Sequence, residues 1–424
     1  MLTHMPCAPL DSDHHAAVPV RADSFRTSRV PTPLAPIVPM HLDTDVAVIG
    51  GGVAGLTVAC QLAAAGQRVT LFEARSRLGG RVVTATAAPL VDTPWLDLGP
   101  AWFWPHQQHI RALVAHFGLS VFEQHRAGLA MYDAGDGRAP QPFDASGQTA
   151  RSYRVVGGMG ALVQALVTAS QTGPHPVTVH RDAAIRTLTR HDDGVVLNGD
   201  GFHCTAGRVI VAAPPRVVAR DIKFAPPLAD RVVETLRSTV TWMAHAMKCV
   251  VTYDAPFWRE AGRSGYAISW GGPLQEIHDA CVPGHDRPTP DRHPAGYALM
   301  GFVAPPTGVA AQGFRAANRE ERRAAVLSQL VRLFGDRAQR PVDYAEYDWS
   351  RETQTCGQDD ALPPGAHPEY GHPLFEGGAA GDSWQGRLVW AGADTVADGG
   401  GYLDGAVASA RRAAATVLAL RTAT

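Results

Sequence analysis

The chain has 424 residues and a mass of 45.1 kDa, enough for two or three domains with a large buried core. Its 38 basic and 40 acidic residues give a net charge of −2, and no basic stripe points to nucleic acid or to an anionic membrane. No apolar run reaches the roughly 20 residues of a membrane helix. The six cysteines are scattered, without disulfide or metal-ligand spacing. Composition therefore predicts a cytoplasmic protein with no metal site.

Residues 1–40 carry Pro, Ser, Asp and His with no hydrophobic period. They lack the apolar segment of a secretory signal, so we expect a disordered extension, or sequence upstream of a start at Met40. His4, His14 and His15 could suggest metal binding, but solvated tail residues explain them more simply.

A β-strand, helix and second β-strand open the folded part of the chain. Asp45–Ile49 is a short apolar run typical of a buried parallel strand. It enters the glycine-rich turn Gly50–Gly55, and an Ala/Leu-rich helix follows that Gly66 ends. Arg68–Glu73 is predicted as the second strand, so this segment reads as one βαβ unit.

The rest of the chain mixes strands and helices. The C-terminal segment predicts a strand, a loop and a long helix from about Asp404 to Leu420, so one parallel domain is expected to be assembled from distant segments. Between the two ends we predict antiparallel strands at Val177–Leu188 and Gly194–Phe202, a strand in Arg208–Pro215, alternating strands at 239–253 and 296–304, and an amphipathic helix at Arg319–Phe334.

The spacing Gly50-x-Gly52-x-x-Gly55, followed by Glu73 at the end of the next strand, predicts a nucleotide site. Glycine permits the tight turn and lets the backbone approach a pyrophosphate. The helix N-terminus then offers N–H groups to the phosphates, and Glu73 is placed to bind the ribose hydroxyls. A glycine-rich turn can also join two elements without a ligand, but the full strand–helix–strand–Glu context favours the nucleotide.

Further segments resemble a known family. The stretch EARSRLGGR, which begins with Glu73, resembles the diphosphate clasp of the FAD superfamily that includes amine oxidases, amino-acid oxidases and phytoene desaturases; a basic surface loop is the simpler alternative. Four further segments follow in the order seen in the flavin monoamine oxidase family: WLDLGPAWFWPHQ, RVVGGMGAL, AMKCVVTYDAPFW and WAGADTVADGGGYLDGA. The resemblance therefore covers about residues 43–424. It implies non-covalent FAD bound by Gly50, Gly52, Val53, Ala54, Gly55, Glu73, Ala74, Arg75, Gly79, Gly80, Arg81, Gly99, Pro100, Ala101, Trp102, Ala184, Gly392, Asp394, Gly401, Tyr402, Leu403 and Ala406.

The C-terminal motif has a physical use in this resemblance. Gly401, Tyr402 and Leu403 open the last helix, so unpaired N–H groups and a positive dipole end are expected there. In the family they meet the edge of the flavin ring that becomes negative on reduction. An ordinary buried helix would explain the alanines that follow but not the glycines before Tyr402.

Lys248 is the candidate catalytic residue, together with Tyr402. The 38 basic residues include only two lysines, Lys223 and Lys248, and Lys, unlike Arg, can shift its pKa readily. If residues 242–250 form a strand, Trp242, Ala244, Ala246 and Lys248 share a face, with the alanines leaving space for water and substrate. The resemblance implies that Lys248 holds a water near flavin N5; the alternative is a strand lysine whose head reaches solvent.

Three positions depart from the family pattern. Cys356 is one or two residues out of register with the cysteine that attaches FAD in some members, which predicts FAD without a covalent link, although attachment through Cys356 stays open. The position of the second aromatic around the amine falls near Gly357, Gln358 or Asp359. We therefore expect Asp359 or Asp360 at that wall, able to pair with a second positive group on the substrate. Asp394 replaces the commoner Glu, which predicts a longer or water-mediated contact to the ribityl chain.

The expected fold is α/β: a Rossmann-like FAD-binding domain assembled from discontinuous segments (41–117, 155–238 and 351–424), plus a mixed α+β substrate-binding domain (118–154 and 239–350). The expected activity is oxidation of a carbon–nitrogen bond in a small amine by hydride transfer to flavin N5, giving an imine, with O2 reoxidising the flavin and releasing H2O2. The alternatives are an L-amino-acid oxidase, an FAD-dependent desaturase or a flavin-binding protein without catalysis. Expected partners are the amine and O2, with no nucleic acid, no membrane and a possible homodimer.

Overall fold

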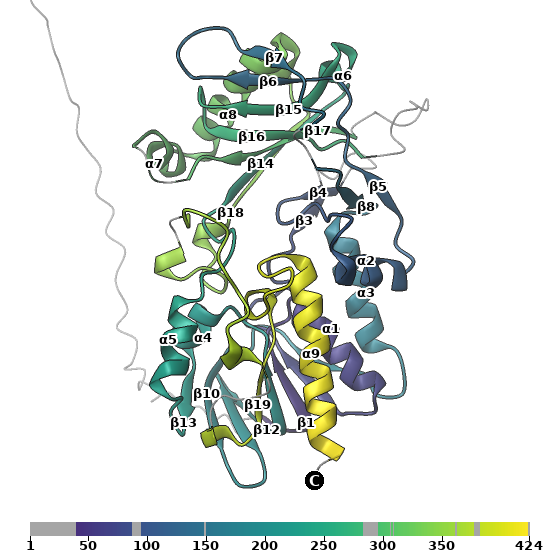
Figure 1. The fold of residues 1–424 in the computed structure, drawn as a ribbon, viewed down its shortest axis with the longest axis vertical. Helices are drawn as coiled ribbons and strands as arrows, with labels where there is room; N and C mark the ends of the chain where they lie inside the picture. Colours follow the sequence, from purple (N-terminus) through teal and green to yellow (C-terminus); the bar gives the residue numbers. More distant parts are fainter. Residues whose placement is uncertain are drawn as a thin grey trace, which may run out of the picture. The chain divides into compact units, whose positions relative to one another are not determined.

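The structure, a computed structural model, describes residues 40–86, 95–147, 150–282, 296–305, 307, 309–360, 363–376 and 382–422. Two large sheets organise these residues (Figure 1). Of the predicted N-terminal extension only Met40 falls in this range, so His4, His14 and His15 lie outside the described residues.

The first sheet has a parallel centre and an antiparallel flank. Its neighbours run in the order β13-β10-β11-β12-β1-β2-β9, and β19 pairs with β12 beyond the end of β11. Parallel pairs join β12 to β1 and β19, and β2 to β1 and β9, as expected of a dinucleotide-binding fold. The bounds are β1 Met40–Ile49, β2 Val69–Phe72, β9 Thr178–His180, β10 Ile185–Arg190, β11 Val195–Gly199, β12 Phe202–Val211, β13 Lys223–Ala225 and β19 Leu388–Trp390.

The first strand is longer than the sequence predicts. We expected it at Asp45–Ile49, but β1 begins at Met40 and pairs with β12 from Met40↔Phe202 onwards. The prediction was wrong because Met40–Thr44 has no uniform apolar run; it is held by backbone pairing to a strand some 160 residues away, which a local pattern cannot show.

A chain that starts at Met40 is expected to fold and hold FAD as well as the full chain does, because β1 is then complete. A chain that starts at Asp45 should melt at a lower temperature, because it lacks the pairs of Met40–Thr44 with β12. Melting curves and the flavin absorbance of the purified proteins check both. Loss of colour on truncation to Met40 would contradict the first expectation.

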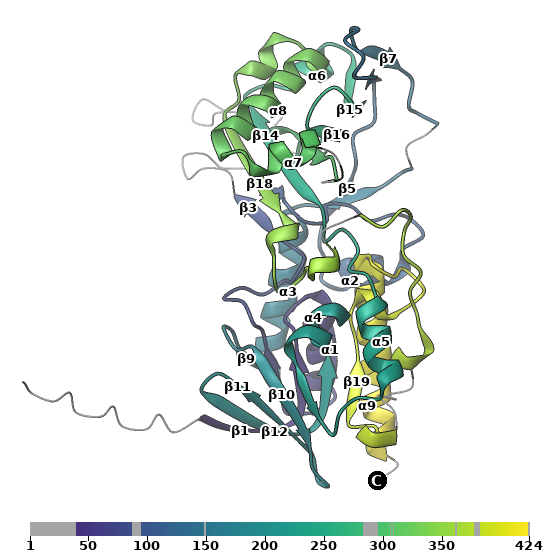
Figure 2. The same ribbon diagram turned by 90° about the vertical axis from the view of Figure 1, so that its left-hand side faces the viewer.

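Helices cover both faces of this sheet because its central strands are buried on both sides. Val46 and Val48 of β1 pack with α1, α2, α3 and α9, while Ala47 and Ile49 pack with α4 and α5. Figures 1 and 2 show α9 beside α1, and α4 beside α5. The bounds are α1 Val53–Ala64, α2 Gln108–His116, α3 Met159–Gln171, α4 Pro215–Asp221, α5 Asp230–Ser238 and α9 Leu403–Thr422.

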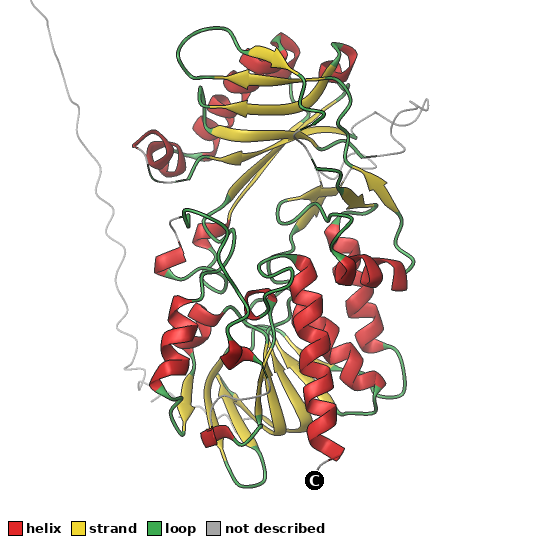
Figure 3. Ribbon diagram, viewed as in Figure 1, coloured by secondary structure: helices red, strands yellow, loops and turns green. Residues whose placement is uncertain are grey.

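The second sheet is mainly antiparallel and has the order β18-β14-β17-β16-β15-β6-β7 (Figure 1). Figure 3 shows its strands in yellow in the same view. Helix α8, Arg319–Phe334 as predicted, begins with an Asn318–Glu321 capping box and packs on one face of the sheet. The other bounds are β6 Leu129–Asp133, β7 Gln141–Phe143, β14 Met247–Tyr253, α6 Phe257–Glu260, β15 Arg263–Ser269, β16 Leu274–Asp279, β17 Tyr297–Val303, α7 Val309–Ala316 and β18 Asp343–Asp348.

Short elements connect the two sheets. Antiparallel pairs form between β3 (Thr84–Thr86) and β4 (Trp95–Asp97) and between β5 (Val121–Glu123) and β8 (Tyr153–Val155).

The predicted α/β fold with two kinds of sheet is confirmed; the proposed domain boundaries stay a prediction. In the ranges that the structure describes, every helix is too short or too polar to cross a membrane. In the same ranges His, Cys, Asp and Glu do not gather in groups able to hold a metal ion.

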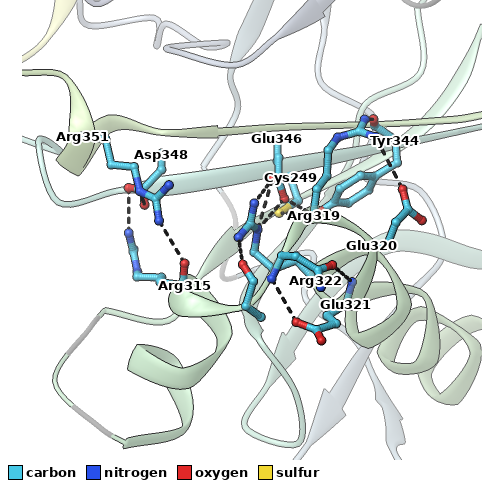
Figure 4. Close-up of polar contacts among 12 residues, drawn as sticks. Cys249, Arg315, Arg319, Glu320, Glu321, Arg322, Tyr344, Glu346, Asp348 and Arg351 are labelled. Atoms are coloured by element: carbon cyan, nitrogen blue, oxygen red, sulfur yellow. Dashed lines mark hydrogen bonds and ion pairs between the residues drawn. The ribbon is translucent and has the colours of Figure 1, made fainter. Parts of the chain in front are cut away.

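Arginines on α7 and α8 hold β18 in place beside β14 (Figure 4). Arg322 donates through Nε to both carboxylate oxygens of Glu346 at 3.1 and 3.0 Å. Arg315 donates to Asp348 at 2.8 Å and also to the carbonyl of His245 at 3.0 Å. These contacts fix the edge strand β18, which lies next to β14, the strand that carries Lys248.

Candidate active site

A cavity of about 590 Å³ is lined on one side by residues that follow the parallel strands β1, β2, β12 and β19. Side chains of β14, β15, β16 and β17 in the second sheet line it as well. The carboxyl ends of parallel strands are where α/β sheets bind their ligands, so this cavity is the candidate active site.

The structure brings the predicted site residues together. The candidate catalytic residues Lys248 and Tyr402 both line the cavity. So do all the predicted cofactor residues except Gly55: Gly50, Gly52, Val53, Ala54, Glu73, Ala74, Arg75, Gly79, Gly80, Arg81, Gly99, Pro100, Ala101, Trp102, Ala184, Gly392, Asp394, Gly401, Leu403 and Ala406.

The glycine-rich turn has the geometry that a pyrophosphate needs. Gly50 has a φ of 106°, which favours glycine. A Cβ on Gly55 would lie 1.9 Å from the carbonyl oxygen of Gly50, so Gly55 serves the close packing of the helix on the strand, behind the cavity. Gly52 is the N-cap of α1 and no side chain caps the helix, which leaves its first N–H groups for an anion.

Glu73 is buried in the cavity wall, with 4% of its surface exposed. One carboxylate oxygen accepts a hydrogen bond from Gly51 N at 2.7 Å and the other accepts one from Arg75 N at 3.0 Å. These bonds fix the carboxylate beside the turn. A carboxylate offers about four acceptor sites, so capacity is left for ribose hydroxyls.

An ion pair joins Arg81, in the stretch EARSRLGGR, to Asp394, in the C-terminal segment. Arg81 donates to both carboxylate oxygens of Asp394, at 3.1 and 2.7 Å, and Asp394 is 1% exposed. A buried carboxylate needs such a partner. The sequence predicted Asp394 only as a contact to the ribityl chain; the pairing with Arg81, 313 residues earlier, is additional.

Lys248 is buried, with 1% of its surface exposed. Its Nζ donates to the carbonyl oxygen of Gly99 at 3.0 Å and lies 5.5 Å from the ring centroids of both Trp102 and Phe302. Burial lowers the pKa of Lys248 to about 7, with Asp97 opposing the shift. The alternative of a lysine that reaches solvent is therefore wrong, and near neutral pH this amine can be uncharged.

The strand that carries Lys248 is shorter than predicted. Residues 239–253 were expected to alternate throughout, but β14 covers only Met247–Tyr253. Before it the chain turns, with Met243 at a φ of 60° and hydrogen bonds from Ala244 N to Thr241 O and from Ala246 N to Met243 O. As a result Ala246 lines the cavity beside Lys248, whereas Ala244 is buried outside it.

Aromatic rings surround Tyr402 even though the predicted second wall position is not aromatic. Trp104 meets Tyr402 edge-on at 6.0 Å, and His367 stacks on it at 5.1 Å with an interplanar angle of 7°. Trp242, which also lines the cavity, lies 4.6 Å from His367. Trp104 could have been noticed from its place two residues after Trp102; His367 reaches Tyr402 through a loop that the sequence left unassigned.

The opening of the last helix is only partly as expected. Gly401 N donates to Ala393 O at 3.0 Å and Tyr402 N donates to Gly399 O at 3.1 Å. These two N–H groups were predicted to be unpaired, and that prediction was wrong because the glycine-rich loop folds back on itself. Leu403, the first residue of α9, lines the cavity, so the positive end of the helix dipole still lies there.

The expectation for Asp359 and Asp360 is wrong. The carboxylate of Asp360 is buried and accepts hydrogen bonds from Arg216 at 2.6 Å, Thr241 N at 3.0 Å and Gly357 N at 2.9 Å. It holds the loop together and does not line the cavity; Asp359 is exposed and does not line it either.

Cys356 does not line the cavity either, although its neighbour Thr355 does. Its thiol is buried, donates to the carbonyl oxygen of Gly357 at 3.1 Å, and burial raises its pKa to about 11. A protonated thiol that faces its own loop is poorly placed to attack a cofactor.

Other residues of the cavity wall were missed in the sequence. Lys248 is the register partner of Phe302 in β17, and Phe302 is the partner of Glu276 in β16. Glu276, Phe302 and His278 all line the cavity. Only the pairing of three strands distant in sequence places them beside Lys248, so no local motif could have found them.

Comparison with known proteins agrees with this site. The model of flavin-containing amine oxidoreductases matches residues 137–418, and that of an NAD(P)-binding Rossmann-like domain matches residues 48–117. A putative flavin-containing monoamine oxidase of Mycobacterium tuberculosis is 30% identical over 89% of this chain and 97% of its own length. Putrescine oxidase of Kocuria rosea is 27% identical over 89% of this chain and 95% of its own length.

Solved structures of the same kind share the fold. A putrescine oxidase bound to putrescine superposes with a TM-score of 0.69 at 24% identity, and cyclohexylamine oxidase from Brevibacterium oxydans with a TM-score of 0.70 at 19% identity. In both cases 90% of this chain and 100% of the other are covered.

The cavity fits FAD, because the N-termini of α1 and α9 both face it and the fixed carboxylate of Glu73 lies beside the glycine-rich turn. The chain therefore belongs to the flavin-containing amine oxidoreductase family, and it is an FAD-dependent oxidoreductase.

Proposed function

We propose that this protein oxidises a carbon–nitrogen bond of a small amine to an imine. FAD held by the residues of the cavity wall would supply N5 as the acceptor of the hydride from the carbon next to nitrogen, while the amine nitrogen would lose a proton. O2 would then take two electrons and two protons and leave as H2O2. The observation that carries the proposal is a buried lysine, Lys248, in the same cavity as the residues predicted for FAD.

The wall around the substrate supports an uncharged amine as the reacting form. Tyr402, Trp104 and Trp242 line the cavity and offer apolar faces, and an apolar environment disfavours an ammonium ion. We infer that Lys248, whose Nζ donates to the Gly99 carbonyl, holds a water that moves a proton or promotes the reaction with O2.

Flavin bleaching without oxygen tests this function. Amines, L-amino acids and amides are mixed separately with the enzyme, and the absorbance of oxidised flavin is followed. Bleaching by small amines, followed by H2O2 on admitting O2, is expected. Bleaching by amino acids alone would favour an L-amino-acid oxidase, bleaching without peroxide a dehydrogenase, and no bleaching a flavin-binding protein without catalysis.

FAD is proposed to be bound without a covalent link, since the Cys356 thiol lies outside the cavity lining. Acid precipitation should leave the yellow chromophore in the supernatant. Colour that stays with the pellet, and that Cys356→Ser releases, would contradict this. The cytoplasmic location and a possible homodimer remain predictions from the sequence.

A further inference from the structure

Gln124 ties Trp102, a residue of the cavity wall, to the second sheet. It is 7% exposed and directly follows β5, where its backbone N–H donates to Ser152 O at 2.9 Å. Its Oε1 accepts a hydrogen bond from the indole Nε1 of Trp102 at 2.7 Å. Its Nε2 donates to the carbonyl oxygen of Asp279, the last residue of β16, at 2.7 Å. One buried side chain therefore joins three segments that are distant in sequence.

The chemistry of these partners allows one orientation of the amide. An indole N–H only donates, so it requires the amide oxygen, and a backbone carbonyl only accepts, so it requires the NH2 group. The Nε2 also donates to the carbonyl oxygen of His125 at 3.3 Å, so both of its hydrogens have an acceptor in the wall. Glutamate, which only accepts when it is ionised, could not serve both ends.

The indole ring that this bond holds lies beside Lys248. The Nζ of Lys248 is 5.5 Å from the ring centroid of Trp102 and 5.5 Å from that of Phe302. An ammonium group has three N–H donors, and the carbonyl of Gly99 accepts from Nζ at 3.0 Å. Aromatic faces within about 6 Å attract a lysine charge. The two rings therefore complete the surroundings of the buried amine.

The two rings are held in different ways. Phe302 belongs to β17 and is the register partner of Lys248, so the ladder between the strands sets its position. Trp102 lies between β4 and α2, outside the named strands, and is partly exposed. Its position is set by side-chain contacts, and the bond from its N–H to Gln124 is the directional one.

We propose that Gln124 is a positioning residue for the flavin reaction: it holds the Trp102 ring against Lys248 and so sustains the half-reaction that depends on this lysine. The inference rests on the proposed function, because it requires that Lys248 acts on the flavin. The effect passes through the ring, since both N–H groups of the amide already have acceptors in the wall. A small displacement beside the reacting groups is enough to slow a reaction.

Stopped-flow traces of the two half-reactions, with an amine that bleaches the flavin, test this role. Gln124→Leu leaves the indole N–H without its acceptor and is expected to slow, by about fivefold or more, the half-reaction that Lys248→Met slows. The other half-reaction should keep its wild-type rate. In a Trp102→Phe background, which has a ring but no N–H to hold, Gln124→Leu should have little further effect, because residues that act through one contact are not additive.

Gln329→Leu is the matched control. Gln329 is a buried glutamine of α8 that also forms a bridge: its amide donates to Ser269 Oγ and accepts from Leu274 N, each at 2.8 Å, and it does not line the cavity. Its substitution should lower the melting temperature and leave the ratio of the two half-reaction rates unchanged.

FAD content and melting temperature are measured for every variant, so that failure to fold is seen. If Gln124→Leu does not fold, Gln124→Asn carries the test. Asparagine keeps the amide but is one methylene too short to keep both bonds, so the same half-reaction should slow.

Four results would overturn the assignment. Equal slowing of both half-reactions, or an effect of Gln124→Leu that persists in Trp102→Phe, makes Gln124 a structural residue. A change confined to the half-saturating concentration of the amine makes it a substrate contact. Wild-type rates for Gln124→Leu or for Lys248→Met overturn the positioning role and leave amine oxidation standing. If no amine bleaches the flavin, the proposed function fails and this inference fails with it.

Discussion

Lys248→Met is expected to slow reduction or reoxidation of the flavin by about tenfold or more, which is roughly 1.4 kcal/mol of barrier. FAD content should change little, and the melting temperature should not fall. Methionine keeps an unbranched side chain, one atom shorter, but removes the charge and the hydrogen bond to the Gly99 carbonyl. Stopped-flow traces of the two half-reactions measure the effect and show which half needs the lysine.

The reason to expect a catalytic effect without a loss of stability is the burial of Lys248. Desolvation lowers its pKa to about 7, so the fold gives up interaction energy with water to hold an amine there. A group kept at such a cost inside a cavity is a candidate for function. Substitution by an apolar side chain of similar size removes that cost.

The second lysine is the natural control. Lys223 is exposed on β13 and does not line the cavity. Lys223→Met should leave both half-reactions at wild-type rates. Equal rates for wild type and Lys248→Met in both halves would show that Lys248 only fills space.

The sequence predicts the elements that depend on the spacing of nearby residues. The turn Gly50–Gly55, the helix Arg319–Phe334 and the last helix follow from glycines, capping residues and the helical period. Almost all the residues that the motifs named line one cavity, because segments that bind the different parts of one cofactor are constrained by its shape.

What the sequence could not predict depends on pairing between distant segments. The start of β1 at Met40 needs β12, and the neighbourhood of Lys248 needs β17 and β16. The turn at Met243 interrupts the predicted strand, although the alternating pattern of side chains continues through this position in the sequence. Asp360 was predicted at the substrate because its partner Arg216, 144 residues earlier, could not be seen.

Glu346→Ala is expected to lower the free energy of unfolding by about 3 to 5 kcal/mol, the cost of breaking a buried ion pair by removing one partner. Glu346 and Arg322 are each 12% exposed at their side chains. Glu346 also accepts a hydrogen bond from the hydroxyl of Tyr344 at 2.7 Å. The alanine variant removes the carboxylate that accepts from this hydroxyl and from the guanidinium, which keeps only its bond to the carbonyl of Ala317 (Figure 4). Denaturant unfolding of the two proteins measures the difference.

Glu320→Ala provides the control, because Glu320 lies on α8, the helix that carries Arg322. Its side chain is 73% exposed, and it meets Arg319 and Arg323 only at 3.9 and 3.8 Å, so less than about 1 kcal/mol is expected. Because Glu346 pairs with Cys249, the residue after Lys248, in the β18–β14 ladder, Glu346→Ala should also loosen the strand that positions the lysine. Unfolding free energies that are equal for the two variants would show that the arginine cluster does not hold β18 against β14.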